Sequence, residues 1–158
     1  MKNTFSTSIY PRKSKRLTAV KLENMKITGS RSEVSEGWKS YWKKMKKEPD
    51  GTVILKDGKV FIGFDLILTN VEFDVLWFED LDIGNVTLEE CTFKEGIHLK
   101  DVNVKDMEVK TRVKKKMRDK KNSFIIHDSK IKRLTVAVLD QFFKFRQQDS
   151  NIDRLDIF

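Results

Sequence analysis

Clustered lysine and arginine side chains are the residues of this chain with the clearest chemical use. The most basic segment, residues 110–122, holds six that we predict to contact phosphate groups: Lys114, Lys115, Lys116, Arg118, Lys120 and Lys121. Each phosphate that such a side chain neutralises releases counterions, which strengthens binding. Lys43 and Lys44 lie in a second basic segment, where Trp38 and Trp42 are candidates for stacking on bases if they are exposed.

No set of residues has the spacing typical of a catalytic or metal site. The histidines are His98 and His127, and each lies at or beside a pair of apolar residues, so both are expected at the surface. Cys91 is the only cysteine, which excludes an intrachain disulfide. The sequence has no HxxxH, CxxC, G-x-S-x-G or glycine-rich phosphate motif. We therefore predict a protein that is not an enzyme and uses no cofactor or metal.

Charge is unevenly distributed along the chain, although its formal total of +8 favours anionic partners. Residues 65–95 contain nine acidic residues and one lysine, whereas residues 96–122 contain ten basic residues against four acidic ones. Two explanations stay open: the opposite charges pair across the fold, or they form separate binding surfaces. For the second explanation, the candidate protein-binding acids are Asp74, Glu79, Asp80 and Asp82.

A five-residue spacing of apolar pairs indicates the elements that position these groups. The pairs are Val71/Phe73, Leu76/Phe78, Leu81/Ile83, Val86/Leu88 and Cys91/Phe93, and after Gly96 they are Ile97/Leu99, Val102/Val104 and Met107/Val109. A helix of 3.6 residues per turn would carry this repeat around its axis, and a long strand would alternate without a break. Short strands joined by tight corners would produce it, which predicts a β-solenoid with one continuous apolar core.

Interruptions of this spacing predict insertions into a single domain, residues 1–158. Apolar residues at helical spacing predict an amphipathic helix over about residues 32–48, capped by Ser32 or Ser35, whose aromatic side chains either cover the core or bind a partner. The basic segment at about 110–122 is predicted to project as a loop. Asp57-Gly58 predicts a β-hairpin, and residues 141–148 are predicted to interrupt or slip the repeat.

The tail repeats itself, because residues 128–136 resemble residues 149–157. The implied coil, about 20–21 residues long, and the five-residue spacing resemble the pentapeptide-repeat family. The resemblance implies a right-handed quadrilateral β-helix over roughly residues 66–157. Bulky residues such as Val71 and Leu76 stand where that family prefers small ones, and only Cys91, Ser129 and Ser150 fit the preference. Another right-handed β-helix is the open alternative. The family's DNA-mimicking inhibitors are acidic, so that activity is not expected here.

These patterns predict a mainly β, non-catalytic scaffold that docks on an anionic partner, most directly nucleic acid or a nucleoprotein complex. The alternative is a protein-directed inhibitor or adaptor whose acidic face fills a basic groove of its target. Phe158 follows an inward residue without a polar cap, which predicts a homodimer through the C-terminal coil; a monomer by light scattering would contradict it. No apolar run approaches the roughly 18 residues of a membrane span, and we expect a cytoplasmic protein.

Overall fold

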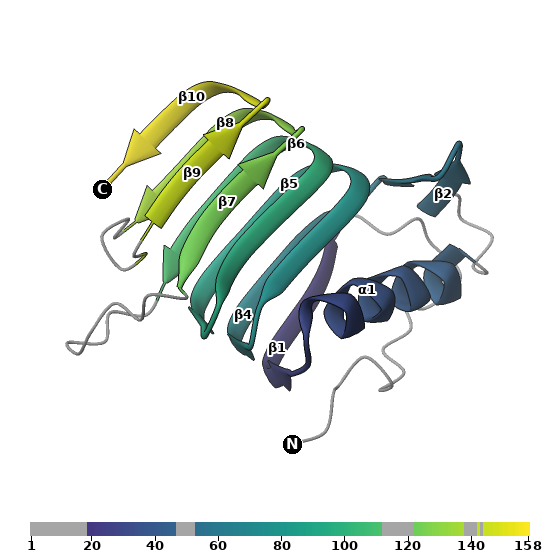
Figure 1. Cartoon of the computed structure of the whole chain (residues 1–158). Helices are drawn as coiled ribbons and strands as arrows, with labels where there is room; N and C mark the ends of the chain where they lie inside the picture. The colour runs from purple at the N-terminus through teal and green to yellow at the C-terminus, as the bar shows by residue number, and fades with distance from the viewer. Residues whose placement is uncertain (1–18, 47–52, 112–121, 138–141, 143) are drawn as a thin grey trace.

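The computed structural model describes residues 19–46, 53–111, 122–137, 142 and 144–158, and in these residues the chain is mainly β (Figure 1). The elements in chain order are β1 (Ala19–Ile27), α1 (Arg31–Lys46), β2 (Val53–Lys56), β3 (Lys59–Ile62), β4 (Asp65–Phe73), β5 (Leu76–Phe93), β6 (Gly96–Thr111), β7 (Ser123–His127), β8 (Lys130–Ala137), β9 (Lys144–Gln148) and β10 (Asn151–Ile157). No described helix has the length and apolarity that a membrane span requires.

Parallel pairing joins most of these strands into one sheet, and most of the parallel pairs share nearly the same sequence offset. The pairs of β1 with β4 and of β6 with β7 and β8 have larger offsets. Leu66 of β4 pairs with Val86 of β5, and Leu76 of β5 pairs with Ile97 of β6, so the two offsets differ by a single position. The pairs of β7 with β9 and of β8 with β10 have the same sequence offset as Leu76 and Ile97. Each repeat of the chain therefore lies beside the next one, as the row of parallel ribbons in Figure 1 shows. We call one such repeat a pass of the chain.

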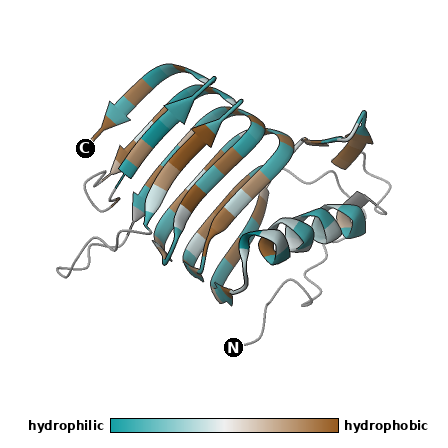
Figure 2. Cartoon of the chain, viewed as in Figure 1, coloured by the Kyte–Doolittle hydropathy of each residue, from teal (hydrophilic) through white to brown (hydrophobic). Residues whose placement is uncertain are grey.

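The five-residue spacing matches the burial of the strands. Every apolar residue of the pattern from Val71 to Val109 is buried, including Cys91, and most of the residues between them are exposed or half-buried. Figure 2 shows the corresponding alternation of hydrophilic and hydrophobic residues along the long strands β4, β5 and β6. Two residues in every five thus point inward, and together those of all passes form one continuous apolar core.

Left-handed backbone residues mark corners in the long strands. Asn70, Asp80 and Glu90 have φ angles of 51°, 54° and 52° and follow one another at equal intervals. A left-handed residue acts like the extra residue of a β-bulge, because it places two outward side chains in succession and bends the strand. Asn and Asp tolerate this conformation better than most residues. In the 18-residue strand β5, Asp80 and Glu90 mark alternate steps of the five-residue period, and the outward pair Gly84–Asn85 between them has no left-handed residue.

Helix α1 is present where the sequence predicts a helix, but its cap is Ser30 rather than Ser32 or Ser35. The backbone N–H of Glu33 donates to Ser30 Oγ, and the N–H of Ser30 donates to Glu33 Oε1 at 3.1 Å. This reciprocal arrangement is a capping box, which the sequence Ser-x-x-Glu encodes. Ser35 is instead buried in the helix, and its hydroxyl donates to Glu79 of β5.

The two other local predictions have different outcomes. The Asp-Gly hairpin is confirmed, since β2 and β3 are antiparallel and both Asp57 and Gly58 have positive φ angles. The interruption predicted over residues 141–148 is wrong for β9, which pairs with β7 at the same offset that joins β8 and β10. There Gln147 lies opposite Ile126, and this polar residue at an inward position hides the repeat in the sequence.

Candidate functional site: a lysine-lined groove and its charged surroundings

A groove of about 520 Å³ crosses the outer face of neighbouring strands β5, β6, β8 and β10. Its lining residues are Asp82, Ile83, Gly84, Asn103, Val104, Lys105, Lys130, Ile131, Lys132, Asn151 and Asp153. All of them come from the same segment of successive passes of the chain. The groove is therefore a direct product of the parallel register.

The register brings three lysines together in the middle of this groove. Lys130 pairs with Asn103 on one side and with Asn151 on the other. Lys105 and Lys132 follow Val104 and Ile131, which pair directly. All three lysine side chains are exposed, and among the described residues none of them forms an ion pair. We call Lys105, Lys130 and Lys132 the groove lysines.

The groove lysines suit a partner with several negative charges. Neighbouring strands lie about 4.8 Å apart, so three ammonium groups on β6 and β8 produce a compact positive potential. Asn103 and Asn151 add amide donors beside Lys130, and Asp82 and Asp153 place negative charge among the lining residues. The lining side chains thus offer cations and amide donors to an anion, beside two carboxylates.

The basic residues named from the sequence are not part of this groove. Lys114, Lys115, Lys116, Arg118, Lys120 and Lys121 lie outside the described residues. Lys43 and Lys44 are on α1, where Lys43 is exposed and Lys44 is half-buried. The groove lysines cannot be recognised in the sequence, because Lys105 is distant from the other two along the chain and becomes their neighbour only when β6 and β8 pair.

Trp38 and Trp42 are buried, which corrects their proposed role in base stacking. Their side chains are each only 2% exposed. The Trp38 ring meets Phe78 edge-on with centroids 5.2 Å apart, and Trp42 packs near Phe64. Burial also raises the pKa of Tyr41 on the same helix to about 12. The aromatic face of α1 covers the core, which is the first of the two explanations that the helical spacing left open.

The acidic residues Asp74, Glu79, Asp80 and Asp82 do not share one surface role. Asp74 Oδ2 accepts a hydrogen bond from the Gly29 N–H at 3.0 Å. Glu79 lies between Lys39 and Lys100, with N–O distances of 3.9 and 3.7 Å. Its charge is therefore offset within the fold, as the pairing explanation proposes. Asp82 lines the groove.

Asp80 belongs instead to a row of corner aspartates: Asp80, Asp101, Asp128 and Asp149. Each has a left-handed backbone, and the residues before them pair in register from β5 through β6 and β7 to β9. Burial, followed by the negative charges of Glu79 and Asp101, raises the pKa of Asp80, while Lys39 and Lys100 oppose the shift. Burial, together with the neighbouring negative charges, thus disfavours ionisation of Asp80.

His98 is buried, contrary to the prediction that it lies at the surface. It is 7% exposed and stacks on Trp77, with ring centroids 4.9 Å apart, while the Arg31 guanidinium lies over the Trp77 ring. Burial, and secondarily the charge of Arg31, lowers the pKa of His98 to about 4. His98 Nε2 has no hydrogen-bond partner among the described residues. The ring is therefore neutral at pH 7 and acts in packing.

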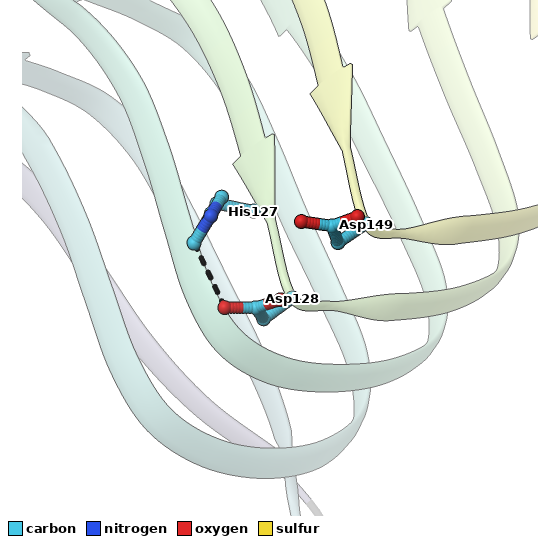
Figure 3. A group of neighbouring side chains, drawn as sticks. All are labelled: His127, Asp128 and Asp149. Carbon is cyan, nitrogen blue, oxygen red and sulfur yellow. Dashed lines mark ion pairs between the residues drawn. The ribbon is translucent and has the colours of Figure 1, made fainter.

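His127, Asp128 and Asp149 form a separate cluster at the corners that follow β7 and β9 (Figure 3). One possible ligand atom from each residue lies within 4.8 Å of the other two. His127 Nδ1 and Asp128 Oδ2 are 3.0 Å apart. The sequence does not reveal this cluster, because Asp128 and Asp149 belong to different passes of the chain and meet only in the stacked register.

The C-terminal strand exposes apolar side chains. Leu155 and Ile157 of β10 are 41% and 52% exposed, and Phe158 is 79% exposed. Ile152, by contrast, is partly buried against the core. Dimerisation through this surface stays a prediction.

Comparisons of the chain with models of known protein families, with curated proteins and with solved structures find no match. The resemblance to the pentapeptide-repeat family therefore stays a prediction that rests on the residues quoted for it.

Proposed function

We propose that this chain is a non-catalytic β-solenoid scaffold whose groove lysines dock on an anionic partner, most directly the phosphate backbone of a nucleic acid or nucleoprotein complex. The observation that carries the proposal is the convergence of Lys105, Lys130 and Lys132 in one groove without ion-pair partners among the described residues. Cations held in this way remain available to an external anion.

The solenoid part of the proposal is supported by contacts that recur from one pass of the chain to the next. Ser129 Oγ accepts a hydrogen bond from the N–H of Val102 at 3.1 Å, and Ser150 Oγ accepts one from the N–H of Ser129 at 3.0 Å. Both hydroxyls donate to the carbonyl two residues earlier, at 2.8 Å. A repeated polar contact between successive passes is what stacked coils of one repeat require.

The choice of a phosphate backbone follows from the side chains that line the groove. Lysines supply point charges for phosphates, whereas base recognition needs exposed aromatic rings or bidentate donors. Trp38 and Trp42 are buried and the groove lining contains no aromatic residue. We therefore expect binding that depends on salt and is nearly independent of nucleotide sequence.

Replacing all three groove lysines by glutamate is expected to weaken binding of a short labelled DNA or RNA by about 10- to 100-fold, because phosphate contacts are lost and repulsion is introduced. Fluorescence anisotropy in about 50 mM salt, with single- and double-stranded probes, measures this. The matched control changes the same number of exposed lysines elsewhere, Lys21, Lys56 and Lys94, to glutamate.

The control alters net charge equally, so it separates the groove from a general effect of charge. Equal weakening by both triple variants would overturn the assignment of the groove. Failure of the wild-type chain to bind any of the probes would overturn the nucleic-acid proposal itself.

The alternative, an inhibitor or adaptor that fills a basic groove of a target protein, has one observation in its favour, the row of corner aspartates. Activity that survives the change of Lys114, Lys115 and Lys116 to glutamate but is lost on charge reversal at Asp80 and Asp82 would favour it. Glu79 is a poor choice for this test because Lys39 and Lys100 already engage it.

A further inference from the structure

We propose that His127, Asp128 and Asp149 form a surface site for a divalent transition-metal ion, with zinc as the ion that the donors fit best. The three residues come from two successive passes of the chain, His127 and Asp128 at the end of β7 and Asp149 after β9 (Figure 3). The site is independent of the groove lysines and of the proposed docking function.

The geometry requires only small side-chain adjustments. One ligand atom from each residue already lies within 4.8 Å of the other two, whereas ligands about 2.0–2.2 Å from a zinc ion are separated by somewhat less. The backbone holds the two corners together, since the Asp128 N–H donates to the Gln148 carbonyl at 3.1 Å. His127 Nδ1 and Asp128 Oδ2 are 3.0 Å apart, so ligation through Nδ1 would replace this direct contact by two bonds to the ion, with loss of any proton that Nδ1 carries.

The donor set selects the class of ion. One imidazole and two carboxylates make an open site with three protein ligands, in which water completes the coordination of zinc. Calcium takes six to eight oxygen ligands and magnesium an octahedral set rich in water, so neither gains from the imidazole. The ion would offset the repulsion between the adjacent carboxylates of Asp128 and Asp149 and would tie the last two passes of the chain together.

The composition of the chain makes the site easy to test. Its only other histidine, His98, is buried against Trp77, and its only cysteine, Cys91, is buried in the core. A zinc signal that needs an accessible imidazole therefore has one source among the described residues, the half-buried His127. The experiment uses the whole chain without a histidine tag, treated with chelator and titrated with ZnCl₂ by calorimetry.

We expect one zinc ion per chain, with affinity at least about tenfold lower in Asp149→Asn and in His127→Gln. Asparagine tolerates the left-handed backbone of residue 149, so loss of folding does not explain the first variant. The matched control is Asp57→Asn, another exposed left-handed aspartate, which should bind zinc like the wild type.

Hydrogen exchange supplies a readout that general surface binding would not change. Zinc is expected to slow exchange of the backbone amides around Gln148 to Asn151 in the wild type and not in Asp149→Asn, because the ion links that corner to the preceding one. No binding at up to about 1 mM zinc, or equal zinc affinity in the wild type and either ligand variant, would overturn the proposal. Calcium binding of equal strength that is unaffected by His127→Gln would also overturn it.

Discussion

Gly96→Ala is expected to destabilise the fold by more than about 4 kcal/mol, the largest effect that we predict for any single substitution. Gly96 begins β6 and pairs with Ser123 of β7 in the next pass of the chain. A Cβ atom at residue 96 would overlap the Ser123 carbonyl oxygen and would lie 2.7 Å from the carbonyl carbon. Because these are backbone atoms, relief requires the two strands to separate.

Gly58→Ala is the matched control for this substitution. Gly58 also has a positive φ, 77° against 89° for Gly96, but a Cβ there would meet no atom within 4 Å. Its expected cost is the conformational penalty alone, about 1–2 kcal/mol. Urea unfolding followed by circular dichroism measures both. Equal destabilisation of the two variants would contradict the close stacking of β6 on β7.

His98→Phe is expected to remove a pH-dependent loss of stability of about 3 kcal/mol between pH 7 and pH 4. Burial, with a smaller contribution from Arg31, lowers the pKa of folded His98 to about 4, below the usual 6.5. In this window the unfolded chain binds a proton that the folded chain does not bind. The free energy of unfolding therefore falls as the pH is lowered from about 6.5 to 4.

Phenylalanine keeps a ring against Trp77 and removes both the titration and the buried Nε2, which has no partner among the described residues. Urea unfolding of the wild type and the variant at pH 7, 5.5 and 4 measures the difference, since the carboxylates that titrate in this range are common to both. If lowering the pH reduced the free energy of unfolding equally in the wild type and in the variant, this prediction would be wrong.

Local sequence patterns predicted much of this fold because two inward residues in every five are enough to specify which side of each strand is buried. Leu81 and Ile83 are buried for the reason that their spacing indicates, and Asp57-Gly58 forms its hairpin from local backbone preference. The capping box at Ser30 is also readable from the sequence, and it starts the helix earlier than the cap at Ser32 or Ser35 that the apolar spacing predicts.

Lateral neighbours could not be predicted, because they depend on the register between passes of the chain. His98 occupies an outward position, yet Trp77 in the adjacent strand and Arg31 in α1 bury it. The groove lysines have no common motif along the sequence and meet only through the pairing of β6 with β8. The pairing of Asn103 with Lys130 spans more residues than most parallel pairings in the sheet, and this hides the column of groove lysines from a search at fixed spacing.

The salt dependence of nucleic-acid binding tests the central claim most directly. The logarithm of the binding constant, measured by anisotropy from about 50 to 200 mM salt, should fall linearly with the logarithm of salt concentration. In the variant with Lys105, Lys130 and Lys132 changed to glutamate, the slope should be smaller by about 2–3, because about three phosphate contacts are lost. An unchanged slope in this variant would contradict docking through the groove.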